Sequence, residues 1–244
     1  IAEVGDRLAT DDAVRVVVLS GAGRGFCAGL DFASFQAMAG AGEDNAFSKP
    51  ESGGSDSGGL GIIGDTGGRI THLGQQVAYT WQQIPVPVIA AVHGVALGGG
   101  FQIALGADLR ICAPDARFSV LEIKWGLIPD MTGTWMLPRL VGLDVAKELT
   151  FTGRMVDGEE AARIGLATRV AEDPHAAAMA LAAELTTKSP DALRAAKRLL
   201  NASGTVDVAE QFAQERLEMG RLIGSPNQVE AVMASFENRS PNFG

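Results

Sequence analysis

Residues 86–100 read Val-Pro-Val-Ile-Ala-Ala-Val-His-Gly-Val-Ala-Leu-Gly-Gly-Gly, a β-branched apolar run that ends in glycines. A similar run at residues 14–20 precedes a second glycine-rich turn at residues 21–31, Gly-Ala-Gly-Arg-Gly-Phe-Cys-Ala-Gly-Leu-Asp. Both runs have the composition of strands that are buried on both faces of a parallel sheet. A strand that turns through glycine into a helix leaves backbone N–H groups unpaired at the helix start. Two such turns can direct N–H groups at one oxygen from two sides, which is how a developing oxyanion is held.

The composition limits the classes of protein that fit. The chain has 244 residues, 46% of them hydrophobic and 20% charged, which is ordinary for a globular enzyme with a sizeable core. A net charge of −9 and a pI near 4.8 argue against a nucleic-acid partner. Two cysteines, Cys27 and Cys112, fit the reducing cytoplasm, where we expect the protein. The histidines form no cluster with cysteine, so no metal is expected, and the apolar stretch 86–109 is too interrupted for a membrane span.

The hydrophobic pattern alternates between strands and helices, which predicts the α/β class. Strands are expected at residues 14–20, 86–92, 109–113 and 118–120. Helices are expected at residues 71–83, 101–105, 145–151, 158–164 and 174–187, and then, after Ser189-Pro190-Asp191, at 192–200, 206–222 and 226–236. We therefore divide the chain into a core, residues 1–188, and a helical C-terminal region, residues 189–244. Residues 40–68 are rich in Gly, Ser and Asp without periodicity, which indicates a long flexible loop or a lid over the ligand.

Several common enzyme motifs are absent from the sequence. A dinucleotide fingerprint that starts at Gly21 fails because Phe26 stands where its last glycine is required. No Gly-Lys-Ser/Thr follows either glycine cluster, which excludes a P-loop, and the G-x-S-x-G and H-E-x-x-H patterns are missing as well. A nucleotide-binding regulatory domain is therefore a weak alternative.

A set of motifs in a fixed order gives the strongest signal. Phe-Cys-Ala-Gly-Leu-Asp at 26–31 is followed by His93-Gly94-x3-Gly98-Gly99-Gly100 and by Phe118-x3-Glu122-x3-Gly-Leu-Ile-Pro at 126–129. Pro-Arg-Leu-Val-Gly at 138–142, Leu-Thr-Phe-Thr-Gly-Arg at 149–154, Ala-Ala-Arg-Ile-Gly-Leu-Ala at 161–167 and the ending at 236–243 continue the series. This order resembles the enoyl-CoA hydratase/isomerase (crotonase) superfamily over nearly the whole chain. By the same resemblance, the family's first strands are expected to precede Ile1.

The resemblance implies a crotonase-type spiral of ββα units with a C-terminal helical trimerisation region, as a homotrimer or a dimer of trimers. It implies an acyl-CoA thioester as the ligand, with coenzyme A as part of the substrate and no separate cofactor, nucleic acid or membrane partner. It also assigns the oxyanion hole to the backbone N–H groups of Leu30 and Gly99. Two donors on a thioester oxygen stabilise the enolate that forms when a neighbouring carbon loses a proton.

The expected proton chemistry departs from that of the family's hydratases, which use two glutamates. One of them corresponds to Glu122, but the other corresponds to Gln102, which cannot exchange a proton. Asp130 offers a second carboxylate, at a separation from Glu122 like that in the family's dienoyl-CoA isomerases. We therefore predict double-bond isomerisation with Glu122 as the base, its pKa raised by an apolar pocket. An enoyl-CoA hydratase of the β-oxidation type is the alternative, and a non-catalytic acyl-CoA binder is another.

Each candidate residue also has a purely structural interpretation. Glu122 could lie on a solvated helix, and Asp130 could serve as an N-cap for a helix that begins near Thr132. Gln102 could be a remnant of the lost carboxylate or a group that positions the substrate by hydrogen bonds. We expect His93 to be a structural hydrogen-bonding residue, and Asp108 and Arg110 to form a structural pair. The substrate-binding set that we assign contains Arg24 near the CoA phosphates, Ala28, Asp31, Gln102, Trp125 in the pocket wall, and Arg239 from the tail.

Overall fold

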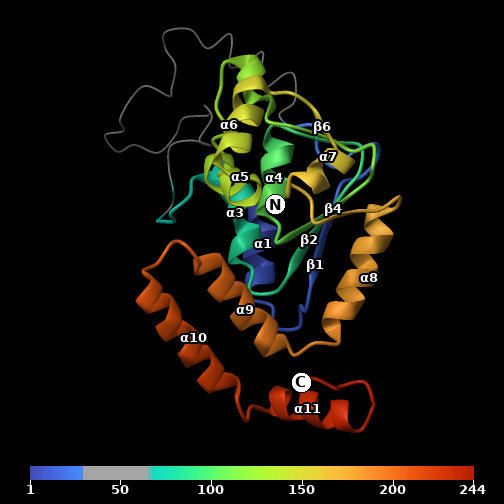
Figure 1. Ribbon diagram of the computed structural model, residues 1–244, viewed down its shortest axis with the longest axis vertical. Coiled ribbons are helices and arrows are strands. Elements are labelled where there is room, and N and C mark those ends of the chain that lie inside the picture. The colour runs from blue at the N-terminus through green and yellow to red at the C-terminus, as the bar shows by residue number, and fades with distance from the viewer. Residues whose placement is uncertain (30–65, 67) are drawn as a thin grey trace.

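A parallel four-stranded sheet lies at the centre of the fold (Figure 1). The computed structural model describes residues 1–29, 66 and 68–244, so the predicted loop at residues 40–68 lies almost wholly outside the described residues. The sheet has the order β1-β2-β4-β7, with strands β1 Val17–Ser20, β2 Val88–Val92, β4 Leu109–Cys112 and β7 Arg169–Val170. The strand segments at residues 88–92 and 109–112 agree with the prediction, whereas β1 begins later than expected.

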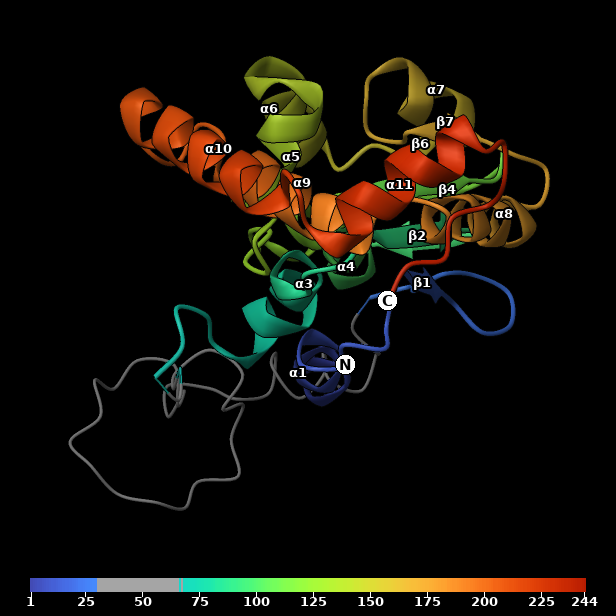
Figure 2. The same ribbon diagram turned by 90° about the horizontal axis from the view of Figure 1, so that it is seen from below.

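Strand β2 separates two apolar layers because successive side chains of a strand point to opposite faces. Ile89 and Ala91 face a cluster that includes Ala178 of helix α8 (Pro174–Thr186). Val88 and Ala90 belong to the main core, which also contains residues of helices α3 (Leu73–Gln83) and α4 (Gly99–Gly106). Figures 1 and 2 show α8 on one side of the sheet and α3 and α4 on the other. All five residues of β2 are buried, as predicted.

The prediction that residues 14–20 are buried on both faces is wrong. The described residues of β1 are half-buried or exposed. The reason is the strand order: β1 is paired only with β2, so it lies at the edge of the described sheet. Its apolar composition is typical of a central strand, but burial depends on the neighbours that the fold supplies.

The fold has a second, smaller sheet, whose strands are interspersed in the sequence with those of the first. It contains β3 Val95–Leu97, β5 Arg117–Ser119 and β6 Val156–Asp157, with β3 parallel and β6 antiparallel to β5. The 3₁₀ helix η1, Leu121–Trp125, directly follows β5. The remaining helices before α8 are α1 Ala2–Ala9, α5 Gly133–Val141, α6 Leu143–Thr152 and α7 Gly158–Arg163. The elements α1, β3, β6 and β7 were not among those predicted from the sequence, because they are short.

The C-terminal region is helical, as predicted. Its helices are α9 Pro190–Ala202, α10 Val208–Leu222 and α11 Pro226–Phe236. Proline at the start of α9 and α11 follows Ser189 and Ser225, whose hydroxyls accept hydrogen bonds from the first turn of each helix. Figure 1 shows α10 and α11 leading away from the sheet. No residue of α10 is buried, so within one chain this helix covers little of the core.

A buried ion pair fixes α9 to the core and corrects the predicted partnership of Asp108 with Arg110. Lys197 of α9 lies 2.7 Å from the Asp108 carboxylate and also donates to the carbonyl oxygens of Trp81 and Val86. Arg110 instead donates to three backbone carbonyl oxygens, those of Leu105, Ala107 and Leu166. Burial raises the pKa of Asp108 and lowers that of Lys197, and their mutual attraction opposes both shifts.

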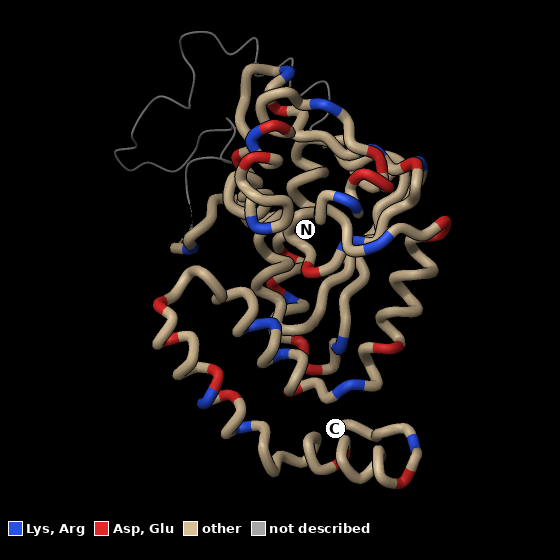
Figure 3. The backbone as a smooth tube through the Cα atoms, in the orientation of Figure 1, with Lys and Arg blue, Asp and Glu red and all other residues tan. Residues whose placement is uncertain are grey.

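The described surface carries charges of both signs. Figure 3 shows acidic and basic residues interspersed along the described backbone. Within the described part of the chain, no helix is long and apolar enough to cross a membrane. The same residues contain no group of three or more His, Cys, Asp and Glu side chains that could hold a metal ion.

We expect Lys197→Met to destabilise the protein by about 3 kcal/mol, because it leaves the partly buried Asp108 carboxylate without its cationic partner. Arg198→Met is the matched control on the same helix. It removes a partly exposed ion pair with Glu218 and should cost about 0–1 kcal/mol. Urea unfolding of both variants measures the difference. Equal destabilisation by the two substitutions would contradict the role of Lys197.

Candidate active site

The two glycine-rich turns lie side by side. The Cys27 amide donates to the Val95 carbonyl oxygen at 2.9 Å, and the Leu97 amide donates to the Cys27 carbonyl oxygen at 3.0 Å. These bonds form an isolated parallel bridge between Cys27 and Ala96. A Cβ atom at Gly100 would stand 2.2 Å from the Cys27 carbonyl oxygen, so only glycine allows this approach. The two turns are therefore adjacent, whereas the convergence of their N–H groups on one oxygen stays a prediction.

The second turn ends at the N-terminus of α4. Gly98 is the N-cap, with φ +52° and ψ −121°, a conformation that only glycine adopts readily. Gly99 is the first residue of α4, where an amide has no acceptor within the helix. Gly29, at the end of the described part of the first turn, comes within 3.5 Å of the Gly99 nitrogen, measured from an ideal Cβ position. The predicted partners Leu30 and Asp31 lie outside the described residues.

Glu122 is held against this turn. It lies on η1 and is only 9% exposed, so the interpretation as a solvated helix residue is wrong. Its carboxylate oxygens are 3.5 and 3.9 Å from the position that a Cβ of Gly98 would occupy. Oε2 is buried and has no hydrogen-bond partner among the described residues. Burial raises the pKa of Glu122, as expected, and the nearby Asp130 raises it further, while the hydrogen bond from Gln102 works against both.

Gln102 is fully buried on α4, and its amide links three parts of the site. Its Nε2 donates to Glu122 Oε1 at 2.6 Å. Its Oε1 accepts hydrogen bonds from the backbone amides of Met131 at 2.8 Å and Gly133 at 3.0 Å. Gln102 is therefore an ordered part of the site that contacts the carboxyl group, rather than a remnant without partners.

Asp130 and the start of α5 complete this side of the site. Asp130 is half-buried, and its charge acts on Glu122. It is not the N-cap of α5, which is Thr132, so the capping interpretation is wrong. Thr132 has φ +73°, a left-handed conformation that is strained for a β-branched residue, and its buried hydroxyl has no partner among the described residues.

Met131 and Thr132 also contribute to the site, and neither was among the residues predicted from the sequence. The Met131 sulfur would lie 3.1 Å from a Cβ atom at Gly99, so this side chain covers the start of α4. No sequence motif indicates either residue, because their roles depend on the packing of the start of α5 beside α4. The family motifs include the glycines and the glutamate, but they do not indicate these contacts.

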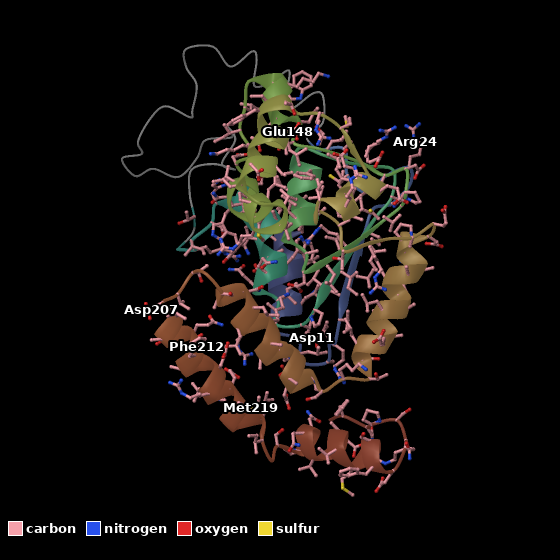
Figure 4. The ribbon with its side chains drawn as sticks, viewed as in Figure 1. Asp11, Arg24, Glu148, Asp207, Phe212 and Met219 are labelled. Carbon is pink, nitrogen blue, oxygen red and sulfur yellow. The ribbon has the colours of Figure 1, made fainter. Side chains whose placement is uncertain are left out.

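The remaining members of the predicted substrate-binding set are more exposed. Arg24 and Ala28 are exposed on the first turn, and Figure 4 places Arg24 at the periphery of the molecule. His93 contacts the Gly23 carbonyl oxygen through Nε2 at 3.1 Å, which confirms its structural role. Trp125 is 41% exposed, and the Lys124 ammonium lies 5.1 Å from the centre of its ring.

The structure does not bring Arg239 to the site within one chain. Its guanidinium pairs with Glu230 at 2.9 Å and with Glu237 at 2.6 Å, both in the same C-terminal segment. Helix α11 lies at the opposite end of the molecule from α6 (Figure 1). Arg239 stays in this segment because its guanidinium already forms ion pairs with these two neighbouring glutamates. Its reach to another subunit stays a prediction.

Comparison with known proteins identifies the family. A family model described as enoyl-CoA hydratase/isomerase matches residues 65–244. The chain belongs to the enoyl-CoA hydratase/isomerase family. A probable enoyl-CoA hydratase from Bacillus subtilis is 33% identical over 241 residues, which cover 98% of this chain and 84% of that protein. A 1,2-epoxyphenylacetyl-CoA isomerase from Escherichia coli is 34% identical over 246 residues, covering 100% and 86%.

Solved structures of the family share the fold. An enoyl-CoA hydratase from Bacillus anthracis superimposes with a TM-score of 0.81 at 30% identity, over 99% of this chain and 85% of that one. The expected crotonase-type α/β fold is thereby confirmed. The predicted trimerisation by the C-terminal region remains untested.

We expect Gly100→Ala to displace the first turn, because its methyl group would overlap the Cys27 carbonyl oxygen. Overpacking of this kind costs about 1–3 kcal/mol and should also lower turnover of a thioester substrate. The control is Gly220→Ala in α10, where a Cβ meets nothing within 4 Å. This change should stabilise the helix by about 0.5–1 kcal/mol. Thermal unfolding and a rate assay measure both effects, and unchanged activity in Gly100→Ala would contradict the close contact.

Proposed function

We propose that this chain moves a double bond in an enoyl-CoA or dienoyl-CoA thioester, with Glu122 as the base. One observation carries the proposal: Glu122 is a buried carboxyl group beside the N-terminus of α4, and its Oε2 has no hydrogen-bond partner among the described residues. Its neighbour Gln102 cannot take up or release a proton. A site with this composition suits proton transfer by one carboxylate better than activation of water between two.

The reaction follows from these groups. For a 3-enoyl thioester, Glu122 Oε2 takes a proton from C2, and the electron pair moves into the thioester carbonyl to give an enolate. The Gly99 amide, together with that of Leu30, donates hydrogen bonds to the negative oxygen. Each such donor lowers the barrier by on the order of 3 kcal/mol. The enolate then reforms the carbonyl while C4 receives the proton from Glu122, and the double bond ends between C2 and C3. Coenzyme A enters as part of the substrate, and no other cofactor takes part.

Hydration is the second candidate. The names of similar proteins favour it, since the Bacillus subtilis protein is called a probable enoyl-CoA hydratase. The isomerase from Escherichia coli, which is similar over the whole chain, supports the first candidate. Gln102 favours isomerisation, because its amide donates to Glu122 Oε1. In a hydratase, a second carboxyl group at this position would help to hold the water molecule.

The oligomer that we propose is a homotrimer or a dimer of trimers. Helices α10 and α11 support it, because they expose large apolar side chains, among them Phe212, Met219 and Phe236. Figure 4 shows Phe212 and Met219 on α10, away from the sheet. Contact with further copies of the chain would cover these residues. Light scattering of the purified protein measures the oligomeric state.

The first experiment incubates the protein with 2-enoyl-, 3-enoyl- and 3,5-dienoyl-CoA and identifies the products by mass and ultraviolet spectrum. Double-bond migration without a change in mass supports the proposal. Addition of one water supports the hydratase instead. A non-catalytic binder would show neither product, and would exchange no α-protons into deuterium oxide.

Glu122→Gln should lower kcat by about 10²–10⁴, because general base catalysis is lost. In the wild type, kcat/KM should fall as the pH drops through the raised pKa of Glu122, since only the carboxylate accepts a proton. Glu148→Gln is the control, because Glu148 is an exposed residue of α6 that pairs with Arg154. Wild-type rates in Glu122→Gln would exclude this residue as the base.

Asp130→Asn should move the acidic limb of the 3-enoyl pH profile to lower pH, because a charge that raises the pKa of Glu122 is removed. If Asp130 is also the second acid/base for longer proton shifts, turnover of the 3,5-dienoyl thioester should fall at least about tenfold more than that of the 3-enoyl thioester. Rates with both substrates across the pH range test this. Equal losses with both substrates would reduce Asp130 to a structural role.

A further inference from the structure

The orientation of the Gln102 amide is fixed by its surroundings. Its oxygen accepts from two backbone donors, the amides of Met131 and Gly133. If the group were turned by 180°, its NH₂ would face these two N–H groups, donor against donor. Both backbone amides belong to the start of α5 and keep their positions. The NH₂ group must therefore point at Glu122.

This orientation makes the two oxygens of Glu122 unequal. Oε1 receives the N–H of Gln102 at 2.6 Å and can act there only as an acceptor. A proton on Oε1 would oppose that N–H, so a protonated Glu122 carries its proton on Oε2. Oε2 is also the oxygen that has no partner among the described residues. The carboxyl group thus has one oxygen bound to the protein and one oxygen free for chemistry.

Gly98 leaves the space into which this carboxyl group faces. An ideal Cβ there would lie 3.5 Å from Oε1 and 3.9 Å from Oε2, which is van der Waals contact. A side chain larger than that of alanine would therefore crowd the carboxyl group. The next residue, Gly99, provides the first amide of α4.

We propose that Gln102 is a positioning residue that confines the exchangeable proton of Glu122 to Oε2 and closes Oε1 to water. This inference rests on the proposed role of Glu122 as the base. It assigns to Gln102 a function in reaction specificity: the site transfers protons through one oxygen and does not hold a water molecule between residues 102 and 122. Gln102 itself exchanges no proton and does not touch the reacting carbon.

The test is the pH dependence of kcat/KM in Gln102→Met, which keeps the length of the side chain but loses the donor to Glu122. The carboxylate is then less stabilised, so activity at the acidic end should fall about tenfold while the alkaline plateau stays within about threefold of the wild type. Gln76→Met is the matched control, because Gln76 is a glutamine with only 2% exposure whose amide bonds to Thr71 and Gln83. It should lower stability without changing the shape of the profile. Identical profiles for Gln102→Met and the wild type overturn the proposal.

Gln102→Glu serves as the second variant, since it preserves the oxygen that accepts from Met131 and Gly133 and so keeps the start of α5 in place. Its other oxygen would face Glu122 Oε1, and the two carboxyl groups would have to share a proton. Activity at the acidic end should again fall about tenfold relative to the plateau, and the fraction of product that contains added water should rise. An unchanged profile with no added water in this variant also overturns the proposal.

The outcome is separable from that of the proposed function. The pH profile of kcat/KM is measured on α-proton exchange of a saturated acyl-CoA in deuterium oxide, which needs the base but no double-bond shift, and the added water is measured separately with 2-enoyl-CoA. If the wild type only hydrates, the isomerase proposal fails, while the exchange profile of Gln102→Met still decides the role of Gln102. If Glu122→Gln exchanges as fast as the wild type, Glu122 is not the base and both proposals fail.

Discussion

The backbone pairing between Cys27 and the segment around Ala96 determines where the rest of the site can be. It joins the end of one glycine-rich turn to the start of another, although about seventy residues separate them in the sequence. Helix α4 begins directly after this contact, and its first turn presents Gly99 and the side chain of Gln102. Without glycine at position 100, the two backbones could not approach, and neither residue would be in its observed place.

Periodicity and motif spacing predicted much of the fold. The strands β2 and β4 were recognisable as short apolar runs, and the C-terminal helices by their helix-start residues and apolar spacing. The exposure of β1 was not predictable in this way, because it depends on the strand order. The partner of Asp108 is a similar case. Lys197 is distant in the sequence, whereas Arg110 is close but turns to backbone carbonyl oxygens.

The candidate site was predictable in its components but not in its connections. Glu122 stood out because its motif fixes its position, and burial gave its pKa the expected direction. The hydrogen bonds from Met131 and Gly133 to Gln102 left no trace in the sequence. They depend on a left-handed Thr132, a conformation that threonine rarely adopts and that sequence patterns therefore do not indicate. Strain at this one residue places both amides on the same oxygen.

The burial of Glu122 also ties catalysis to folding energetics. A carboxyl group with a higher pKa in the folded chain than in the unfolded chain binds its proton more tightly when folded. Its contribution to stability is therefore greatest at low pH, and it declines as the pH rises from the unfolded pKa through the folded one. At a pH above its folded pKa, the folded protein holds this group ionised in a place that disfavours charge. The property that makes this carboxylate a strong base is thus the property that weakens the fold around it, a trade-off between activity and stability located in a single side chain.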